Sequence, residues 1–202
     1  MMKYMLLLFT CAILHALPAS AQETQTLFGD TDIRHGGFGA PVFGVTLVNG
    51  QPAYLRGTRW AWGINFTEDH TINVGFGNYR TRSDFEPASW DYPGGTPDMR
   101  TDYGGFELEY VNQTHRLVHL SVQTLIGSGT VRYRNGREFL DRTSDTYFVL
   151  QPGINMNLNV TRWFRVSGGL HYRYSGGVNL EGTNNSDLSG ITSFAALRFG
   201  WF

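Results

Sequence analysis

Residues 148–160 read FVLQPGINMNLNV, and this stretch decides the fold. Every second residue from Phe148 to Val160 is apolar, whereas the residues between them from Gln151 to Asn159 are polar or small. Because the side chains of a β-strand point alternately to its two faces, a period of two over this length predicts a long strand. One face of that strand is apolar and the other is polar.

The same alternation recurs in other segments of the chain. In the segment 103–111, for example, Glu107 and Glu109 alternate with Phe106 and Leu108. We therefore expect eight strands, at about 38–48, 54–66, 71–79, 103–111, 117–127, 148–160, 164–174 and 190–202.

The connections between these strands differ in length. Asn49-Gly50 is typical of a tight hairpin turn. Three further connections are short (67–70, 113–116 and 161–162), and three are long and rich in polar residues, Gly or Pro (81–101, 135–144 and 175–189). Short turns at one end and longer loops at the other are typical of an outer-membrane barrel whose two chain ends lie on the periplasmic side. We predict an all-β, closed, eight-stranded antiparallel up-and-down transmembrane barrel.

The triplet Asn-x-Thr occurs at 65–67, 112–114 and 159–161, at a constant spacing of 47 residues. Each copy follows an even-numbered expected strand. Asn and Thr side chains bond to nearby backbone groups, so we interpret the triplet as the entry to each short periplasmic turn. The alternative is a glycosylation acceptor.

The N-terminus has the features of a secretory signal peptide. Lys3 precedes an apolar run, and Ala19-Ser20-Ala21 offers a cleavage site of small residues. The remaining chain contains neither Cys nor Lys, its charge is close to balanced, and it has no basic block, so we expect no disulfide framework and no nucleic-acid partner. The expected organisation is a signal peptide at 1–21, an N-terminal periplasmic lead or small plug at 22–36, and an outer-membrane barrel at 37–202.

Two barrel architectures fit eight alternating strands. In a soluble lipocalin-like barrel that binds an apolar ligand, the apolar face points inward, whereas in a membrane barrel it meets lipid. The polar faces here are rich in Asn, Gly, Ser and Gln, which pack together in a narrow interior, and this composition favours the membrane barrel. We predict a lumen that is filled by a polar network: Arg59, Glu107, Glu109, His119, Gln123, Gln151, Asn155, Asn157, Arg165, His171, Arg173 and Arg198. We predict an aromatic girdle formed by Trp60, Trp62, Phe66, Tyr110, Phe164, Tyr172 and Tyr174. Trp163 falls in phase with the polar set of its strand.

Two patterns raise the question of catalysis or metal binding. His119 and Ser121 share one strand face, similar to the His-x-Ser of outer-membrane lipid A deacylases, in which Ser is the nucleophile. His119 and His171 both fall on polar faces, but two His without a tight motif are a weak metal signal. We expect no catalytic, metal or cofactor site. A lipid-modifying enzyme that uses His119 and Ser121 is kept as an alternative.

The sequence also resembles a known group of proteins. The stretches GGFGAP (36–41), LVHLSVQTLIGSG (117–129), FVLQPGINMNLNVTRWFRV (148–166) and the terminal RFGWF are similar to those of small OmpA/OmpX-type barrels, particularly uncharacterised Bacteroidota-type members. This resemblance implies the outer membrane of a Gram-negative bacterium. It implies outer-membrane lipid and the barrel-assembly machinery as partners, and the loop 82–101, with its aromatic residues, is a candidate site for an extracellular partner. Phe202 matches the usual terminal Phe, although Leu197, Phe199 and Trp201, out of phase with Phe202, form the apolar face of the last strand.

Overall fold

The computed structural model describes residues 34–67, 69–82, 98–135 and 138–202. The predicted signal peptide, the lead up to residue 33 and the centre of the loop 82–101 lie outside the described residues. In the described part of the chain, no helix is long and apolar enough to cross a membrane.

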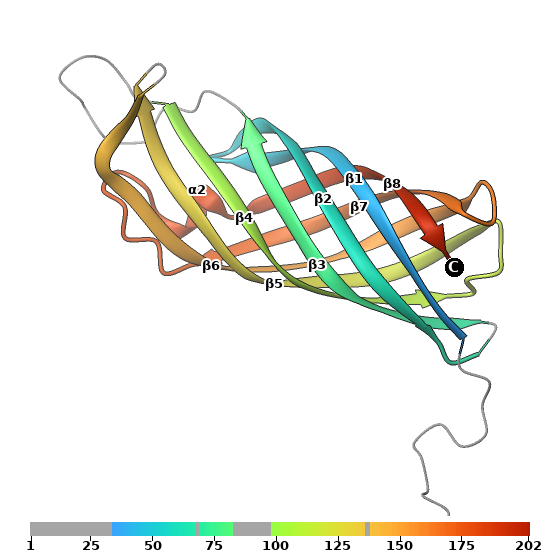
Figure 1. The fold of residues 1–202 in the computed structure, drawn as a ribbon. Coiled ribbons are helices and arrows are strands. Elements are labelled where there is room, and N and C mark those ends of the chain that lie inside the picture. The colour runs from blue at the N-terminus through green and yellow to red at the C-terminus, as the bar shows by residue number, and fades with distance from the viewer. Residues whose placement is uncertain (1–33, 68, 83–97, 136–137) are drawn as a thin grey trace, which may run out of the picture. The chain divides into compact units, whose positions relative to one another are not determined.

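Eight strands form one closed antiparallel barrel, in which each strand pairs with the next and β8 returns to pair with β1 (Figure 1). The predicted fold class is therefore confirmed. The strands are β1 (Arg34–Val48), β2 (Gln51–Asn65), β3 (His70–Arg82), β4 (Asp98–Asn112), β5 (Val118–Asn135), β6 (Glu138–Asn159), β7 (Phe164–Gly176) and β8 (Gly190–Trp201), and a short helix α2 (Asn185–Leu188) precedes β8. We call the rim with the three short turns the turn end and the opposite rim the loop end.

Several strands are longer than the sequence indicated. The expected loop 135–144 was wrong, because β5 and β6 stay paired out to Asn135 and Glu138, and their hairpin rises past the β1–β2 turn in Figure 1. Residues 138–145 (EFLDRTSD) lack alternation, but backbone pairing needs no apolar face. β1 likewise begins at Arg34, inside the predicted lead. The Asn49-Gly50 turn is confirmed, and both residues have positive φ, as a two-residue hairpin requires.

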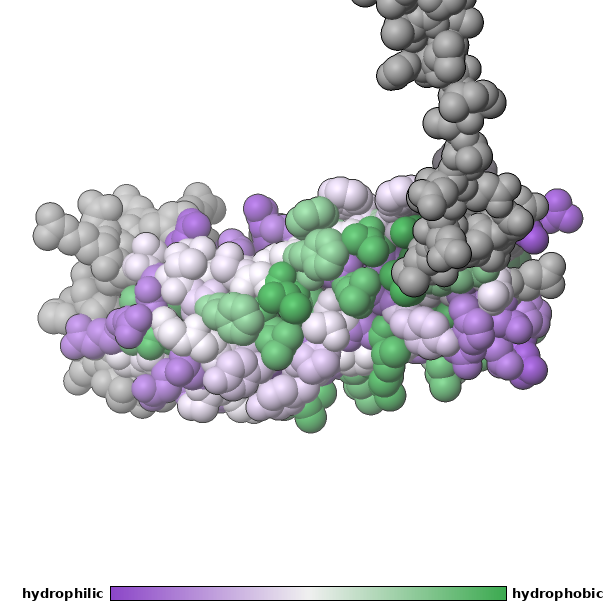
Figure 2. All heavy atoms as spheres, turned by 90° about the horizontal axis from the view of Figure 1, so that it is seen from below, coloured by the Kyte–Doolittle hydropathy of each residue, from purple (hydrophilic) through white to green (hydrophobic). Residues whose placement is uncertain are grey.

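The exposed apolar side chains lie on the outside of the barrel. Leu120, Ile154 and Met156 are between 59% and 64% exposed, whereas Asn155 and Asn157 are buried. Figure 2 shows apolar residues gathered over the middle of the visible face and hydrophilic residues towards both ends. The lipocalin-like alternative needs the opposite orientation, so it is wrong. Such an outer surface is suited to acyl chains.

One residue faces the opposite way to its predicted phase. Trp163 is 58% exposed and stacks on Phe199, with ring centroids 6.2 Å apart. It lies in the turn before β7, where the two-residue period does not yet apply. The last strand faces as expected, because Phe199 and Trp201 are exposed.

The three Asn-x-Thr triplets lie where the sequence predicted, because β2, β4 and β6 end at Asn65, Asn112 and Asn159. Thr67 Oγ1 accepts hydrogen bonds of 3.2 Å from the backbone N–H groups of Asp69 and His70. These contacts close the first turn.

Two of the triplets also connect neighbouring turns. Asn159 Nδ2 donates to the carbonyl oxygens of Thr114 (2.9 Å) and Arg116 (2.7 Å) in the preceding turn. Thr71 Oγ1 donates to Asn65 Oδ1 and lies 2.9 Å from Thr114 Oγ1. Contacts between side chains and neighbouring turns therefore tie the whole turn end together.

We expect Asn159→Ala to lower the free energy of unfolding by about 1–3 kcal/mol, because two hydrogen bonds to backbone carbonyls are lost. Asn112→Ala is the matched control: it occupies the same motif position, is exposed, and makes no side-chain hydrogen bond with the described residues. Urea unfolding of the barrel in lipid vesicles measures both. Equal losses would contradict the role of these contacts.

Candidate functional site

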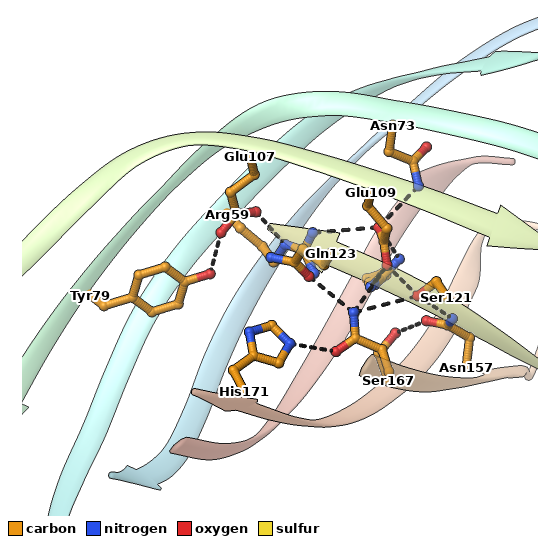
Figure 3. A network of polar contacts seen from close by, with 12 residues as sticks. Arg59, Asn73, Tyr79, Glu107, Glu109, Ser121, Gln123, Asn157, Ser167 and His171 are labelled. Atoms are coloured by element: carbon orange, nitrogen blue, oxygen red, sulfur yellow. Dashed lines mark hydrogen bonds and ion pairs between the residues drawn. The ribbon is translucent and has the colours of Figure 1, made fainter. Parts of the chain in front are cut away.

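The interior of the barrel brings most of the predicted polar residues together around Glu109 (Figure 3). Alternation along β4 points Glu109 inward, and only 1% of its surface is exposed. Arg198 on β8 donates from Nη2 to Glu109 Oε1 (2.7 Å) and from Nη1 to Oε2 (3.0 Å). This fork-to-fork geometry is the strongest arrangement of an Arg and a carboxylate.

Four other side chains complete the contacts of Glu109. Ser121 Oγ (2.6 Å) and Asn155 Nδ2 (3.2 Å) donate to Oε1. Asn73 Nδ2 (3.0 Å) and Arg59 Nη2 (3.4 Å) donate to Oε2. Both oxygens of this buried carboxylate are therefore well satisfied, which offsets the large cost of removing a charge from water.

Glu107 forms a second buried pair one step further from the turn end. Arg59 Nε donates to Glu107 Oε2 (2.9 Å), and the hydroxyl of Tyr79 donates to Oε1 (2.5 Å). Arg59 bridges the two carboxylates, since its Nη2 also reaches Glu109. The interior at this level thus holds two Glu and two Arg whose charges cancel.

Amide and hydroxyl groups link this charged centre to the far wall. Asn155 Nδ2 donates to Gln123 Oε1 (3.0 Å), and Asn155 Oδ1 lies 2.9 Å from His171 Nε2. Next to it, Asn157 accepts a hydrogen bond of 2.6 Å from Ser167. These residues are all buried, so the network extends along the inner wall from β5 through β6 to β7.

Two predicted lumen arginines lie away from the carboxylates. Arg173 is buried near the loop end, where its Nε donates to the carbonyl of Leu188 (2.7 Å) and its Nη2 to that of Leu47 (3.1 Å). Arg165 is half-buried at the turn end, with its guanidinium carbon 3.9 Å from the ring centroid of Phe202. Gln151 is buried. Its neutral amide brings no charge to this part of the interior.

His119 and Ser121 face inward, and their geometry does not support the deacylase alternative. Ser121 Oγ donates a hydrogen bond to Glu109 Oε1 (2.6 Å) and accepts one from Asn157 Nδ2 (3.1 Å). His119 Nδ1 lies 3.1 Å from the carbonyl oxygen of Arg116. Within the described residues there is no hydrogen bond between His119 and Ser121. A nucleophile that cuts lipid must be activated by its base and must reach the lipid side, and this Ser does neither.

No group of three or more metal-ligating side chains occurs within the described ranges. At the turn end, a cavity of about 10 Å³ lies between Phe38, Arg165 and Phe202. That volume is about the least that holds one water molecule.

The residues predicted for the aromatic girdle lie on the outer surface. Trp60, Trp62, Tyr110, Tyr172 and Tyr174 are between 41% and 58% exposed. Phe66 and Phe164 are half-buried, and Phe164 stacks on Phe199 with ring centroids 4.9 Å apart. Sequence reasoning omitted Phe199, Trp163 and Trp201, which extend this aromatic surface at the turn end.

Sequence reasoning also missed the residues that fill the loop end of the interior. Tyr79 and Tyr103 are buried and stack with ring centroids 5.2 Å apart. Tyr133 donates to the carbonyl of Glu181 (2.6 Å), and Leu188 of α2 is fully buried beside them. Most of these residues lie in parts of the chain that were interpreted as loops or as strand ends. Their inward alternation with polar neighbours was the signal that could have revealed them.

No protein-family model and no curated protein matches this sequence. Solved structures do match. The attachment invasion locus protein Ail of Yersinia pestis is 14% identical, with a TM-score of 0.55, over 83% of this chain and 98% of that chain. Ail in complex with the heparin analogue sucrose octasulfate is 16% identical, with a TM-score of 0.53, over the same shares of both chains.

Neisserial surface protein A is 15% identical, with a TM-score of 0.53, over 82% of this chain and 96% of that chain. Identities this low show a common fold and nothing finer. The chain thus has the all-β, closed, eight-stranded antiparallel fold of the small outer-membrane barrels.

Proposed function

We propose that this protein is a non-enzymatic barrel in the outer membrane of a Gram-negative bacterium, with a lumen plugged by its own side chains. It acts as a structural or surface-interaction protein through the loop end, which faces the cell exterior. The observation that carries this proposal is the buried cluster around Glu109, in which both carboxylate oxygens accept hydrogen bonds from neighbouring strands and which lies in the middle of the barrel. The Bacteroidota affinity stays a prediction.

Three features support a surface role. The β5–β6 hairpin is the longest of the barrel, with strands of 18 and 22 residues. The chain from 177 to 189 packs back over the loop end, where Tyr133 and Leu188 anchor it. Two proteins of the same fold are described as an attachment invasion locus protein and a surface protein, and the first binds a heparin analogue in its crystal structure.

The plugged lumen predicts that the barrel does not conduct ions. We expect purified monomeric barrel in planar lipid bilayers to give no large, stable conductance, because charged side chains block the middle of an eight-stranded lumen. Large steady channels from the monomer would contradict the proposal.

The same cluster is expected to dominate stability. Glu109→Ala leaves Arg198 and Arg59 facing each other in a dry interior, so the free energy of unfolding should fall by about 3–5 kcal/mol in lipid vesicles. Replacing both members of the pair (Glu109→Met with Arg198→Met) should cost less than the single change, because fewer charges are left unpaired. Glu181→Ala, at the exposed loop end, is the control. A double variant that is less stable than Glu109→Ala would refute this account.

The orientation can be tested because the predicted mature chain contains no Cys. We expect Glu181→Cys, at the loop end, to react with a membrane-impermeant maleimide on intact cells. Arg162→Cys, in an exposed turn at the opposite rim, should react only after the cells are lysed. If Arg162→Cys alone is labelled on intact cells, the orientation is the opposite of the one proposed. Release of the protein without detergent would exclude a membrane location.

A further inference from the structure

The outer wall of β2 to β5 changes character in three successive rows. The first row consists of Trp60, Phe76, Phe106 and Ile126, which lie opposite one another in register across the four strands. Each is between 41% and 58% exposed, and Phe76 contacts both Trp60 and Phe106, with centroids 5.2 Å and 5.8 Å apart. This row is a continuous apolar surface at the edge of the apolar band.

The second row, one step nearer the loop end, is small and polar. Thr58, Asn78, Gly104 and Ser128 lie in register there. Because Gly104 has no side chain, a groove of about 450 Å³ opens over it, lined by hydroxyl and amide groups above and by Trp60 and Phe76 below. The groove therefore offers hydrogen-bonding groups directly beside an apolar surface.

Four arginines lie on the same outer face beyond the groove, and we call them the arginine strip: Arg56, Arg80, Arg100 and Arg132. Arg56 lies opposite Arg80, and Arg100 lies opposite Arg132. Arg56, Arg80 and Arg132 are exposed, and Arg100 is half-buried. Like charges directly opposite on neighbouring strands repel each other, so this arrangement is unfavourable for the strands themselves.

Asp102 lies in register opposite Arg80, and Arg100 and Arg132 lie one step further from the groove. Asp102 lines the groove and stands 4.0 Å from Arg80, with both side chains about half exposed or more. An exposed pair at that separation contributes little. Arg56 and Arg80 outnumber this carboxylate, so the part of the strip beside the groove keeps a net positive charge.

Resting on the outer-membrane location proposed above, we propose that the groove and the arginine strip bind the phosphorylated sugar head group of an outer-leaflet glycolipid. The arginine strip pairs with the phosphates, since the guanidinium fork matches phosphate geometry. Thr58, Asn78 and Ser128 bond the sugar hydroxyls, and the acyl chains run down over the row that begins at Trp60 and Phe76.

The order of the rows favours a lipid over a soluble anion. A free phosphate or a soluble sulfated glycan needs only the arginines, and it gains nothing from the apolar row. An amphiphile contacts all three rows at once. The order of the rows, from charge through hydroxyl groups to apolar surface, matches the order of phosphate, sugar and acyl chain in a phosphorylated glycolipid. The site also lies on the outer wall, where the barrel meets the membrane, and not inside the plugged lumen.

The test is native mass spectrometry of the mature barrel in detergent, titrated with bisphosphorylated lipid A, monophosphorylated lipid A and phosphatidylcholine. We expect affinity to fall in that order. The double variant Arg56→Gln with Arg80→Gln should bind bisphosphorylated lipid A roughly 10- to 30-fold more weakly, since each arginine near an anionic lipid surface changes the affinity by roughly three- to fivefold.

The control is Arg116→Gln with Arg162→Gln, which removes the same charge from exposed positions at the turn end and should bind like the wild type. Heat-modifiable gel migration verifies that all variants are folded. Equal affinity for the three lipids, or equal losses in both double variants, would overturn the proposal. Displacement of bound lipid A by inorganic phosphate or a heparin fragment at matched concentration would overturn it too, because the arginines would then bind a soluble anion.

Discussion

The bidentate pair between Glu109 and Arg198 is the interaction on which the rest of the structure depends. Eight strands make a lumen just wide enough for side chains, and a charge enclosed there is tolerated only when it is fully paired. Arg198 comes from the last strand and Glu109 from the fourth, so the pair spans the barrel and requires that the sheet has closed in the right register. A slip of one residue along β4 would turn Glu109 toward lipid, where it has no partner. The cluster therefore specifies the barrel as much as it stabilises it.

A second constraint is that side-chain polarity inverts along some of the strands, of which β5 is the clearest case. In β5, Leu120 and Val122 point outward near the turn end, and Ser121 and Gln123 point inward. Further along the same strand, the buried residues are apolar or aromatic, and the outward ones are Thr130 and Arg132. Over one part of its length β5 thus has the apolar outer face of a membrane barrel, and beyond it the strand resembles one of a soluble barrel. Closure by backbone pairing is common to both parts, while the surrounding medium decides which face is apolar.

This inversion explains how far the sequence could be interpreted. Within the apolar band, the alternation from Phe148 to Val160 was enough to predict the strand, its two faces and its end at Asn159. Beyond the band the expected polarity reverses, so a search for apolar outward residues ended the strands too early. Tyr103 was therefore left at the edge of a predicted strand. The segment 138–144 was left out for another reason, because its sequence lacks alternation. The partners of Glu109 could not be predicted in the same way. Alternation shows that Arg59 and Arg198 face inward. Which carboxylate each arginine contacts depends on the register of strands that are far apart in the sequence.

Some residues beyond the apolar band hold the fold together, and others do not. Beyond the apolar band, the interior is held by stacked Tyr79 and Tyr103 and by the packing of Leu188, and none of these contacts involves the outward arginines. Placing Arg56 opposite Arg80 contributes repulsion to that region. Each arginine stands on its own strand, so no single stretch of sequence shows the strip, and it exists only once the register is set. A feature that costs stability, lies outside the core and adjoins an apolar outer surface is best explained by the bound amphiphile proposed above, and its charge requires that ligand to be anionic.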